Sequence, residues 1–310
     1  MRNDPTIDSP IDLSVDNHRT VSLIGFGEAG QAFAKGWQGD LLGLKIDAFD
    51  IKTAADATAK GKWQDYETAG ITGQPSSANL LAWADLVVCL VTADQALGAA
   101  QDAAKSIRPG AYYFDGNSCA PQTKQTNAAV IETAGGRYVD MAIMAPVFPK
   151  LHKVPVLLSG PHAVPAAELL AGLNMSARVE EGDVGRASSI KMIRSIMVKG
   201  IEALVAECVL AGRRAGVDDV VLASLEQSHP GFGWTDRAAY NLERMMQHGQ
   251  RRAAEMREVA QTVDDLGLNN AMSGAIVDWQ QLIGDLALDP GENSYETRAD
   301  AILSALDNQE

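Results

Sequence analysis

The sequence is poor in cysteine and has no long apolar run. Its 310 residues include three cysteines, Cys89, Cys119 and Cys208, and no two of them share a C-x-x-C spacing. This usage is typical of a reducing cytoplasm, and it predicts neither a disulfide framework nor a metal site. No uninterrupted apolar stretch is long enough to span a bilayer. We therefore expect a cytoplasmic protein with no structural metal and no membrane partner.

Basic residues are also scarce relative to acidic ones. The chain has 26 Lys and Arg against 40 Asp and Glu, which gives a net charge of −14. Nothing neutralises phosphates in bulk, so we exclude nucleic acid as a partner. The first nineteen residues are polar and acidic, and they lack the basic start and apolar core of a signal peptide. We interpret residues 1–19 as a flexible N-terminal extension.

What the sequence does have is a G-x-G-x-x-G pattern between an apolar run and a helix-forming run. Residues 21–24 read as a strand, and the three glycines follow directly. Such glycines permit a tight turn, the close approach of a pyrophosphate, and packing of the helix on the strand. The N-terminus of the helix adds free N–H groups for the phosphate charge. The predicted cofactor contacts here are Gly25, Phe26, Gly27, Glu28, Ala29 and Gly30.

An acidic residue follows at the distance that a dinucleotide site requires. Asp50 ends a second predicted strand, residues 44–49, and a carboxylate at this position accepts hydrogen bonds from an adenosine ribose. It repels a 2′-phosphate, although Lys52 partly offsets that repulsion. We therefore expect NAD or NADP as cofactor, with NAD slightly favoured. Val91 and Thr92 follow a buried strand and are predicted to pass along the cofactor.

The two halves of the chain differ in periodicity. Strand-like and helical runs alternate up to residue 181, whereas long helical patterns over 188–215 and 240–266 dominate the rest. Alternation predicts a Rossmann-type α/β domain with a doubly wound, mostly parallel sheet. We place this domain at residues 20–181. We expect an all-α domain for substrate binding and homodimer formation at residues 182–310.

A loop after the predicted strand 111–115 is the first polar grouping that is suited to chemistry. Asn117 and Ser118 offer an amide, a carbonyl and a hydroxyl for a substrate carboxylate or hydroxyl. The same residues also suit a turn that caps the next helix. The residues alone leave both interpretations open.

A lysine within an apolar helix is the second grouping. Lys191 lies between Ile190 and Met192, so it either extends to solvent along its stem or lies in a cleft with a shifted pKa. A lysine of lowered pKa can take a proton from a hydroxyl as hydride leaves. Ser195 lies one helical turn further on and shares the same face.

A polar stripe on the second long helix is the third grouping. His248, Arg251, Arg252 and Glu255 fall at i, i+3, i+4 and i+7, which places them on one face. Such a stripe forms either an anion site for a substrate or an ion-pair network, and Arg251 with Glu255 also fits a simple i,i+4 pair.

Together these features resemble the β-hydroxyacid dehydrogenase and 6-phosphogluconate dehydrogenase superfamily over residues 20–290. The glycine turn matches the family fingerprint, and residues 115–118 resemble its substrate loop. Gly182, Gly185 and Lys191 match the motif G-x-x-G-x-G-x-x-x-K-x-x-x-N, whose lysine is the catalytic acid/base in the family. The third glycine and the asparagine of this motif are Ala187 and Ser195 here.

The second half is similar to a phosphogluconate dehydrogenase-like branch with a C-terminal helical domain of unknown function. The resemblance implies an NAD(P)-dependent oxidoreductase that transfers hydride between nicotinamide and a small anionic hydroxyacid of β-hydroxyacid or sugar-acid type. It implies Lys191 as general acid/base and Ser195 as its assistant. The implied substrate contacts are Asn117, Ser118, His248, Arg251 and Arg252. The alternatives are an imine or keto reductase on the same fold, and a cofactor-binding regulatory protein without turnover.

Overall fold

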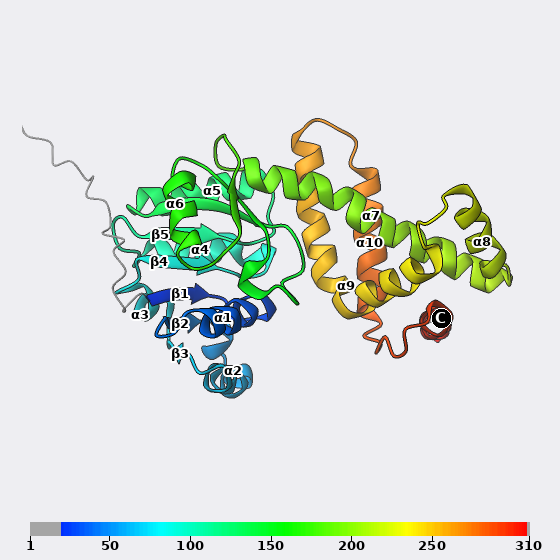
Figure 1. Cartoon of the computed structure of the whole chain (residues 1–310), viewed down its shortest axis with the longest axis horizontal. Coiled ribbons are helices and arrows are strands. Elements are labelled where there is room, and N and C mark those ends of the chain that lie inside the picture. Colours follow the sequence, from blue (N-terminus) through cyan, green and yellow to red (C-terminus); the bar gives the residue numbers. More distant parts are fainter. Residues whose placement is uncertain (1–19, 309–310) are drawn as a thin grey trace, which may run out of the picture. The chain divides into compact units, whose positions relative to one another are not determined.

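The computed structural model describes residues 20–308, and these form two compact units (Figure 1). The first contains residues 20–91, 99–116 and 129–181. The second contains residues 92–98 and 117–128 together with everything described from 182 onward. Two short segments from the first half of the chain thus belong to the second unit. The predicted extension at residues 1–19 lies outside the described residues.

The first unit contains one eight-stranded sheet in the order β3-β2-β1-β4-β5-β6-β7-β8. All neighbouring strands run parallel except β6 and β7. The strands are β1 (Thr20–Ile24), β2 (Lys45–Phe49), β3 (Thr72–Gly73), β4 (Leu86–Cys89), β5 (Tyr112–Asp115), β6 (Arg137–Ile143), β7 (Val156–Ser159) and β8 (Ala177–Val179). The predicted doubly wound, mostly parallel sheet is confirmed. The strand order reverses between β1 and β4, and open α/β sheets bind ligands at this reversal.

Helices connect the strands and bury apolar faces on the sheet. They are α1 (Glu28–Asp40), α2 (Asp56–Ala69), α3 (Ser77–Leu81), α4 (Ala96–Ala104), α5 (Pro121–Thr133) and α6 (Ala163–Ala171), with short 3₁₀ turns η1 (Ile51–Thr53), η2 (Ala93–Gln95) and η3 (Leu151–Lys153). Phe33 and Trp37 of α1 are fully buried and share a core with Leu158 of β7 and Leu170 of α6. Burying side chains of this size contributes roughly 2–3 kcal/mol each, so this core holds α1 and the turn before it against the sheet.

The described part of the second half is helical, as predicted. Its helices are α7 (Arg186–Ala215), α8 (Asp218–Ser228), α9 (Trp234–Asp265), α10 (Ala271–Asp285) and α11 (Tyr295–Asp307). Helix α9 packs along both α7 and α10 (Figure 1). It begins six residues before the predicted start at 240, because Gly233 takes a left-handed φ of +72° that turns the chain into the helix. Over residues 20–308, no helix combines the length and the apolar character that a membrane span requires.

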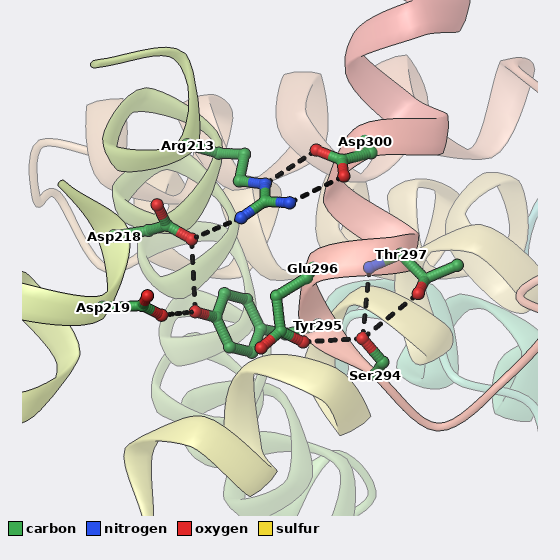
Figure 2. A network of polar contacts seen from close by, with 8 residues as sticks. All are labelled: Arg213, Asp218, Asp219, Ser294, Tyr295, Glu296, Thr297 and Asp300. Carbon is green, nitrogen blue, oxygen red and sulfur yellow. Dashed lines mark hydrogen bonds and ion pairs between the residues drawn. The ribbon is translucent and has the colours of Figure 1, made fainter. Parts of the chain in front are cut away.

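An ion-pair network fixes the last helix to α7 and α8 (Figure 2). The Arg213 guanidinium donates two hydrogen bonds of 2.7 Å to Asp300 of α11, and its third nitrogen lies 3.2 Å from Asp218. The Tyr295 hydroxyl donates to Asp219 at 2.6 Å. Bidentate arginine–carboxylate pairs add geometric specificity as well as energy, so this network sets the position of α11.

Two glycines let the backbones of α9 and α10 touch. A Cβ on Gly249 would lie 2.4 Å from the Gln280 carbonyl oxygen, and a Cβ on Gly284 would lie 2.5 Å from the Gln250 nitrogen. Backbone atoms cannot move away as a flexible side chain can. The close helix crossing therefore depends on the absence of side chains at both positions.

We predict that Gly249→Ala lowers the free energy of unfolding by about 1–3 kcal/mol, the usual cost of overpacking. Gly274→Ala is the matched control, because no described atom lies within 4 Å of its Cβ position on α10. There the better helix propensity of alanine should raise stability by up to about 1 kcal/mol. Urea unfolding followed by circular dichroism measures both. Equal effects of the two substitutions would contradict the packing argument.

Candidate functional site

The glycine turn after β1 has the geometry that the sequence predicts. Gly25 has a φ of +88°, and a Cβ there would lie 2.6 Å from the Leu90 carbonyl oxygen. Its N–H donates to the Phe49 carbonyl at 2.8 Å. A Cβ on Gly30 would lie 2.7 Å from the Gly25 carbonyl oxygen. The first glycine therefore makes the turn, and the last one lets α1 pack against it.

The second glycine leaves the start of α1 open. Gly27 is the N-cap of α1, is exposed, and has no described atom within 4 Å of its Cβ position. It has no side chain to accept from the N–H groups of the first turn. Glu28 is exposed, Ala29 is half-buried, and Phe26 is fully buried against Tyr66. An open helix N-terminus of this kind fits the pyrophosphate of a dinucleotide.

Asp50 is hydrogen bonded to the glycine turn. Its Oδ2 accepts from the Phe26 N–H at 2.8 Å, and its Oδ1 accepts from the Lys52 N–H at 3.0 Å. Sequence reasoning missed Lys62 of α2, whose buried ammonium donates to the Phe26 carbonyl at 2.9 Å and pairs with Asp65 at 2.7 Å. The helical spacing of Lys62 alone did not indicate that it contacts the glycine turn. Asp50 therefore holds the N–H of Phe26, and Lys62 holds its carbonyl.

The predicted cofactor loop after β4 begins beside this turn. Val91 Cγ1 would lie 3.0 Å from a Cβ on Gly25, so it borders the turn directly. Thr92 is exposed and is the N-cap of η2. It is the first residue of the chain that belongs to the second unit.

The second unit joins two of the predicted polar groupings. The Lys191 ammonium of α7 donates to the Ser118 hydroxyl at 2.7 Å, across 73 residues of sequence. Ser118 follows the last residue of β5 by three positions, and Asn117 beside it is buried. The loop and the lysine therefore form one polar site.

The loop is held in place from α9 and η2. Glu258 of α9 accepts from the Ala120 N–H at 2.7 Å and from the Thr123 hydroxyl at 3.3 Å. This carboxylate occupies the N-terminus of α5, where a negative charge is favourable. The Cys119 thiol lies 3.6 Å from the Ala93 carbonyl. Glu258 was not predicted as a site residue, although it lies within the helical pattern predicted over 240–266.

The environment of Lys191 makes its neutral form more accessible than that of an ordinary lysine. Burial lowers the pKa of Lys191 to about 8, and the nearby ammonium groups of Lys124 and Lys199 act in the same direction. The Glu255 carboxylate opposes them, and Cys119 does so to a smaller extent. Desolvation disfavours the charged form of a lysine. Lys191 is therefore able to exchange a proton near neutral pH.

Ser195 lies between Lys191 and Lys199 on α7 and is hydrogen bonded to both residues. Its hydroxyl donates to the Lys191 backbone carbonyl at 2.9 Å and accepts from the Lys199 ammonium at 3.3 Å. Lys199, in turn, pairs with Glu255 at 2.9 Å. Sequence reasoning missed Lys199 and the fully buried Lys124. The spacing of 191, 195 and 199 on one helix face was a usable signal for Lys199.

The polar stripe on α9 divides into two environments. The exposed Arg251 donates to Glu255 at 2.7 Å, as an i,i+4 pair. Arg252 is buried and donates to Glu202 of α7 at 2.9 Å, and Gln280 donates to the same carboxylate oxygen at 2.9 Å. Burial lowers the pKa of Arg252 and raises that of Glu202. His248 is half-buried on α9.

A cavity of about 370 Å³ lies elsewhere in the second unit, among α8, α9 and α11. Its lining includes Asp219, Glu226, Trp234 and Glu296, and none of the predicted site residues. The Glu226 carboxylate accepts from the Gly233 N–H at 3.0 Å and from the Trp234 N–H at 3.3 Å. The acidic lining therefore includes a carboxylate that caps a helix. Among residues 20–308, no group of His, Cys, Asp and Glu is arranged to hold a metal ion.

Two family models match the chain. Residues 20–146 match the NAD binding domain of 6-phosphogluconate dehydrogenase, and residues 213–283 match a domain of unknown function, DUF1932. The second match contains the α9 stripe. A conserved hypothetical protein from Sinorhizobium meliloti is 36% identical, over 93% of this chain and 96% of that one, with a TM-score of 0.70.

Further solved structures share the fold. A conserved protein of unknown function, described as structurally similar to 3-hydroxyacid dehydrogenases, is 28% identical over 92% of this chain and 99% of that one, with a TM-score of 0.64. The 3-hydroxyisobutyrate dehydrogenase of Mycobacterium tuberculosis is 14% identical over 92% and 99%, with a TM-score of 0.67. An imine reductase of Streptomyces aurantiacus is 17% identical over 93% and 99%, with a TM-score of 0.53.

These matches agree with the glycine turn, the strand order and the helical second half. The dehydrogenase and the imine reductase, both below 25% identity, share the fold only. The chain therefore belongs to the same family as the Sinorhizobium meliloti protein, and it combines the NAD binding domain of 6-phosphogluconate dehydrogenase with a C-terminal DUF1932 domain.

Proposed function

We propose that this protein is an NAD(P)-dependent oxidoreductase that acts on the CH–OH group of a small anionic hydroxyacid, with Lys191 as general acid/base. One observation carries the proposal: Lys191, whose pKa is lowered to about 8, donates to Ser118 at 2.7 Å. A general base works best when its pKa lies near the working pH. The resemblance to 3-hydroxyacid dehydrogenases supports the substrate class.

The residues of the second unit then have the following roles. A neutral Lys191 keeps two N–H bonds and one lone pair, so it can donate to Ser118 while the lone pair takes the proton of the substrate hydroxyl. A nicotinamide, when bound, would accept the hydride that leaves the carbon bearing this hydroxyl. Asn117 and Ser118 hold the substrate carboxylate or a neighbouring hydroxyl. Arg251 and His248 attract the negative charge of the substrate from α9.

The first unit binds the cofactor in this proposal. The N-terminus of α1 at Gly27 receives the pyrophosphate, and Asp50 receives the adenosine ribose. Asp50 is fixed by two backbone N–H groups, so its carboxylate stays in place when a ligand arrives. A fixed carboxylate repels a 2′-phosphate, and we therefore propose NAD as the preferred cofactor over NADP.

We predict that Asp50→Asn reduces the preference for NAD by at least about tenfold, or about 1.4 kcal/mol. The amide removes the charge that repels a 2′-phosphate, and its single oxygen keeps one of the two hydrogen bonds from backbone N–H groups. Isothermal titration calorimetry with NADH and NADPH gives the ratio of the two dissociation constants without any substrate. Asp56→Asn removes the same charge from the exposed first turn of α2 and should leave the ratio unchanged. An unchanged ratio in Asp50→Asn would remove Asp50 from cofactor selection.

The first test of the activity uses the absorbance of the reduced nicotinamide. Purified protein is assayed with NAD and with NADP against hydroxyacids, sugar acids and the corresponding keto acids, and cyclic imines are included. Turnover of a hydroxyacid or keto acid supports the proposal. Turnover of imines alone would favour the imine reductase alternative. Cofactor binding without turnover of any compound would favour a regulatory protein.

A further inference from the structure

A buried ion pair beside Lys191 has no part in the proton transfer proposed above. The Lys199 ammonium of α7 lies 2.9 Å from Glu255 Oε2 of α9, and the two side chains are 7% and 14% exposed. Lys191, Ser195 and Lys199 follow one another at intervals of four residues, so they lie on one face of α7. Lys199, one member of the pair, therefore lies on the same face of α7 as Lys191.

Hydrogen bonds connect this pair to the backbone of Lys191. Lys199 donates to the Ser195 hydroxyl at 3.3 Å, and that hydroxyl donates to the Lys191 carbonyl at 2.9 Å. The other oxygen of the Glu255 carboxylate accepts from Arg251 at 2.7 Å. Both oxygens of Glu255 are thus held by cations, which fixes the carboxylate in the electrostatic surroundings of Lys191.

The two partners act on Lys191 in opposite directions. After burial, Glu255 is the strongest influence on the pKa of Lys191, and it raises that pKa, whereas Lys124 and Lys199 lower it and Cys119 raises it slightly. Burial alone would raise the pKa of Glu255, but Lys199, Arg251 and Lys191 together hold it down at about 2. Glu255 therefore stays ionised at every pH at which a lysine could accept a proton.

We propose that Lys199 and Glu255 form a positioning pair that sets the proton affinity of the Lys191 amine. While the pair is intact, its two charges oppose each other at Lys191. The loss of one partner leaves the charge of the other uncompensated in a buried place. The link to catalysis rests on the proposed function, whereas the effect on proton affinity is a property of the three side chains themselves.

The test measures the titration of Lys191 directly, in full-length protein with ¹³C- and ¹⁵N-labelled lysine. The Lys191 signal is assigned by its loss in Lys191→Met. Glu255→Gln should lower the midpoint by about one pH unit, because it removes the negative charge that raises the pKa of Lys191. Lys199→Met should raise the midpoint by a smaller amount, because Lys199 is the weaker of the two influences. The midpoint of the double variant should lie between those of Glu255→Gln and the parent protein.

A matched control comes from the other buried ion pair between the same helices. Glu202→Gln removes the carboxylate that pairs with Arg252 at 2.9 Å and should leave the Lys191 midpoint in place. The proposal is overturned if Glu255→Gln and Lys199→Met leave the midpoint unchanged or move it in the same direction. If one single variant fails to fold, the direction of the shift in the other still decides.

The outcome separates this proposal from the proposed function. Opposite shifts of the Lys191 titration, together with full turnover in Lys191→Ala, would support the positioning pair and reject Lys191 as the acid/base. Loss of turnover in Lys191→Ala, with no shift of the titration in either pair variant, would support Lys191 as the acid/base and reject the positioning pair.

Discussion

Lys191→Ala is expected to lower kcat by about two to four orders of magnitude, the usual contribution of a general acid/base. The substitution removes the only group that donates to Ser118 from α7 among the described hydrogen bonds, and with it the proton acceptor. The assay follows nicotinamide absorbance with the best substrate of the panel. Added methylamine should restore part of the lost rate, because the truncated side chain leaves room for a small amine.

The pH dependence follows from the same residue. Oxidation needs the neutral amine, so kcat/KM for the hydroxyacid should rise with pH and level off above about 8, the pKa of Lys191. Reduction of the keto acid needs the ammonium form, so its rate should fall over the same range. Lys105→Ala removes a lysine whose side chain is 72% exposed and should change neither profile. Full turnover in Lys191→Ala would assign the proton transfer to another group.

Arg252→Met is expected to lower the free energy of unfolding by about 3–5 kcal/mol, the cost of leaving a buried charge without its partner. The charge left behind is Glu202, which among the described hydrogen bonds then keeps the one from Gln280. Chemical unfolding of the parent and the variant measures the difference. Arg251→Met, at an exposed i,i+4 pair, should cost about 0.5 kcal/mol or less.

The cost of Arg252→Met should also depend on pH. Burial already raises the pKa of Glu202 above its ordinary value, and the loss of Arg252 raises it further. The folded variant then binds a proton more readily than the unfolded chain, so its stability falls as the pH rises between the two pKa values. The destabilisation should be larger at pH 8 than at pH 5. A stable variant with weakened substrate binding would instead make Arg252 a substrate contact.

Local patterns in the chain were sufficient to predict the cofactor half. A buried strand, three spaced glycines and an acid after the next strand are local features, and each imposes its own backbone geometry. Glycine is the only residue type that fits position 25, where φ is +88° and a Cβ would lie 2.6 Å from a carbonyl oxygen. The alternation of strands and helices then predicted the sheet, because parallel strands need crossover helices. The short β3 and β8 were missed, since two or three residues carry no period.

The long helices of the second half were also predicted from their periodicity, and so was the i,i+4 pair of Arg251 with Glu255, but the pairing of Arg252 with Glu202 was not. Periodicity places His248, Arg251, Arg252 and Glu255 on one face of a helix, yet it cannot say which neighbour each side chain meets. In the structure, Arg252 pairs with the buried Glu202, and Arg251 pairs with Glu255. Contacts between α7 and α9 join residues about fifty positions apart, and no local pattern encodes such a pair.

The sequence by itself therefore determined the α/β sheet, the glycine turn, the helical second half and the presence of Lys191 in an apolar helix. Only the tertiary structure decided that Lys191 meets Ser118, that Arg252 meets Glu202, and that Lys199 and Glu255 form a buried pair. The physical reason is the distance along the sequence between the residues that determine each property. Backbone conformation follows from neighbouring residues, whereas burial, proton affinity and ion pairing depend on groups that only folding brings together.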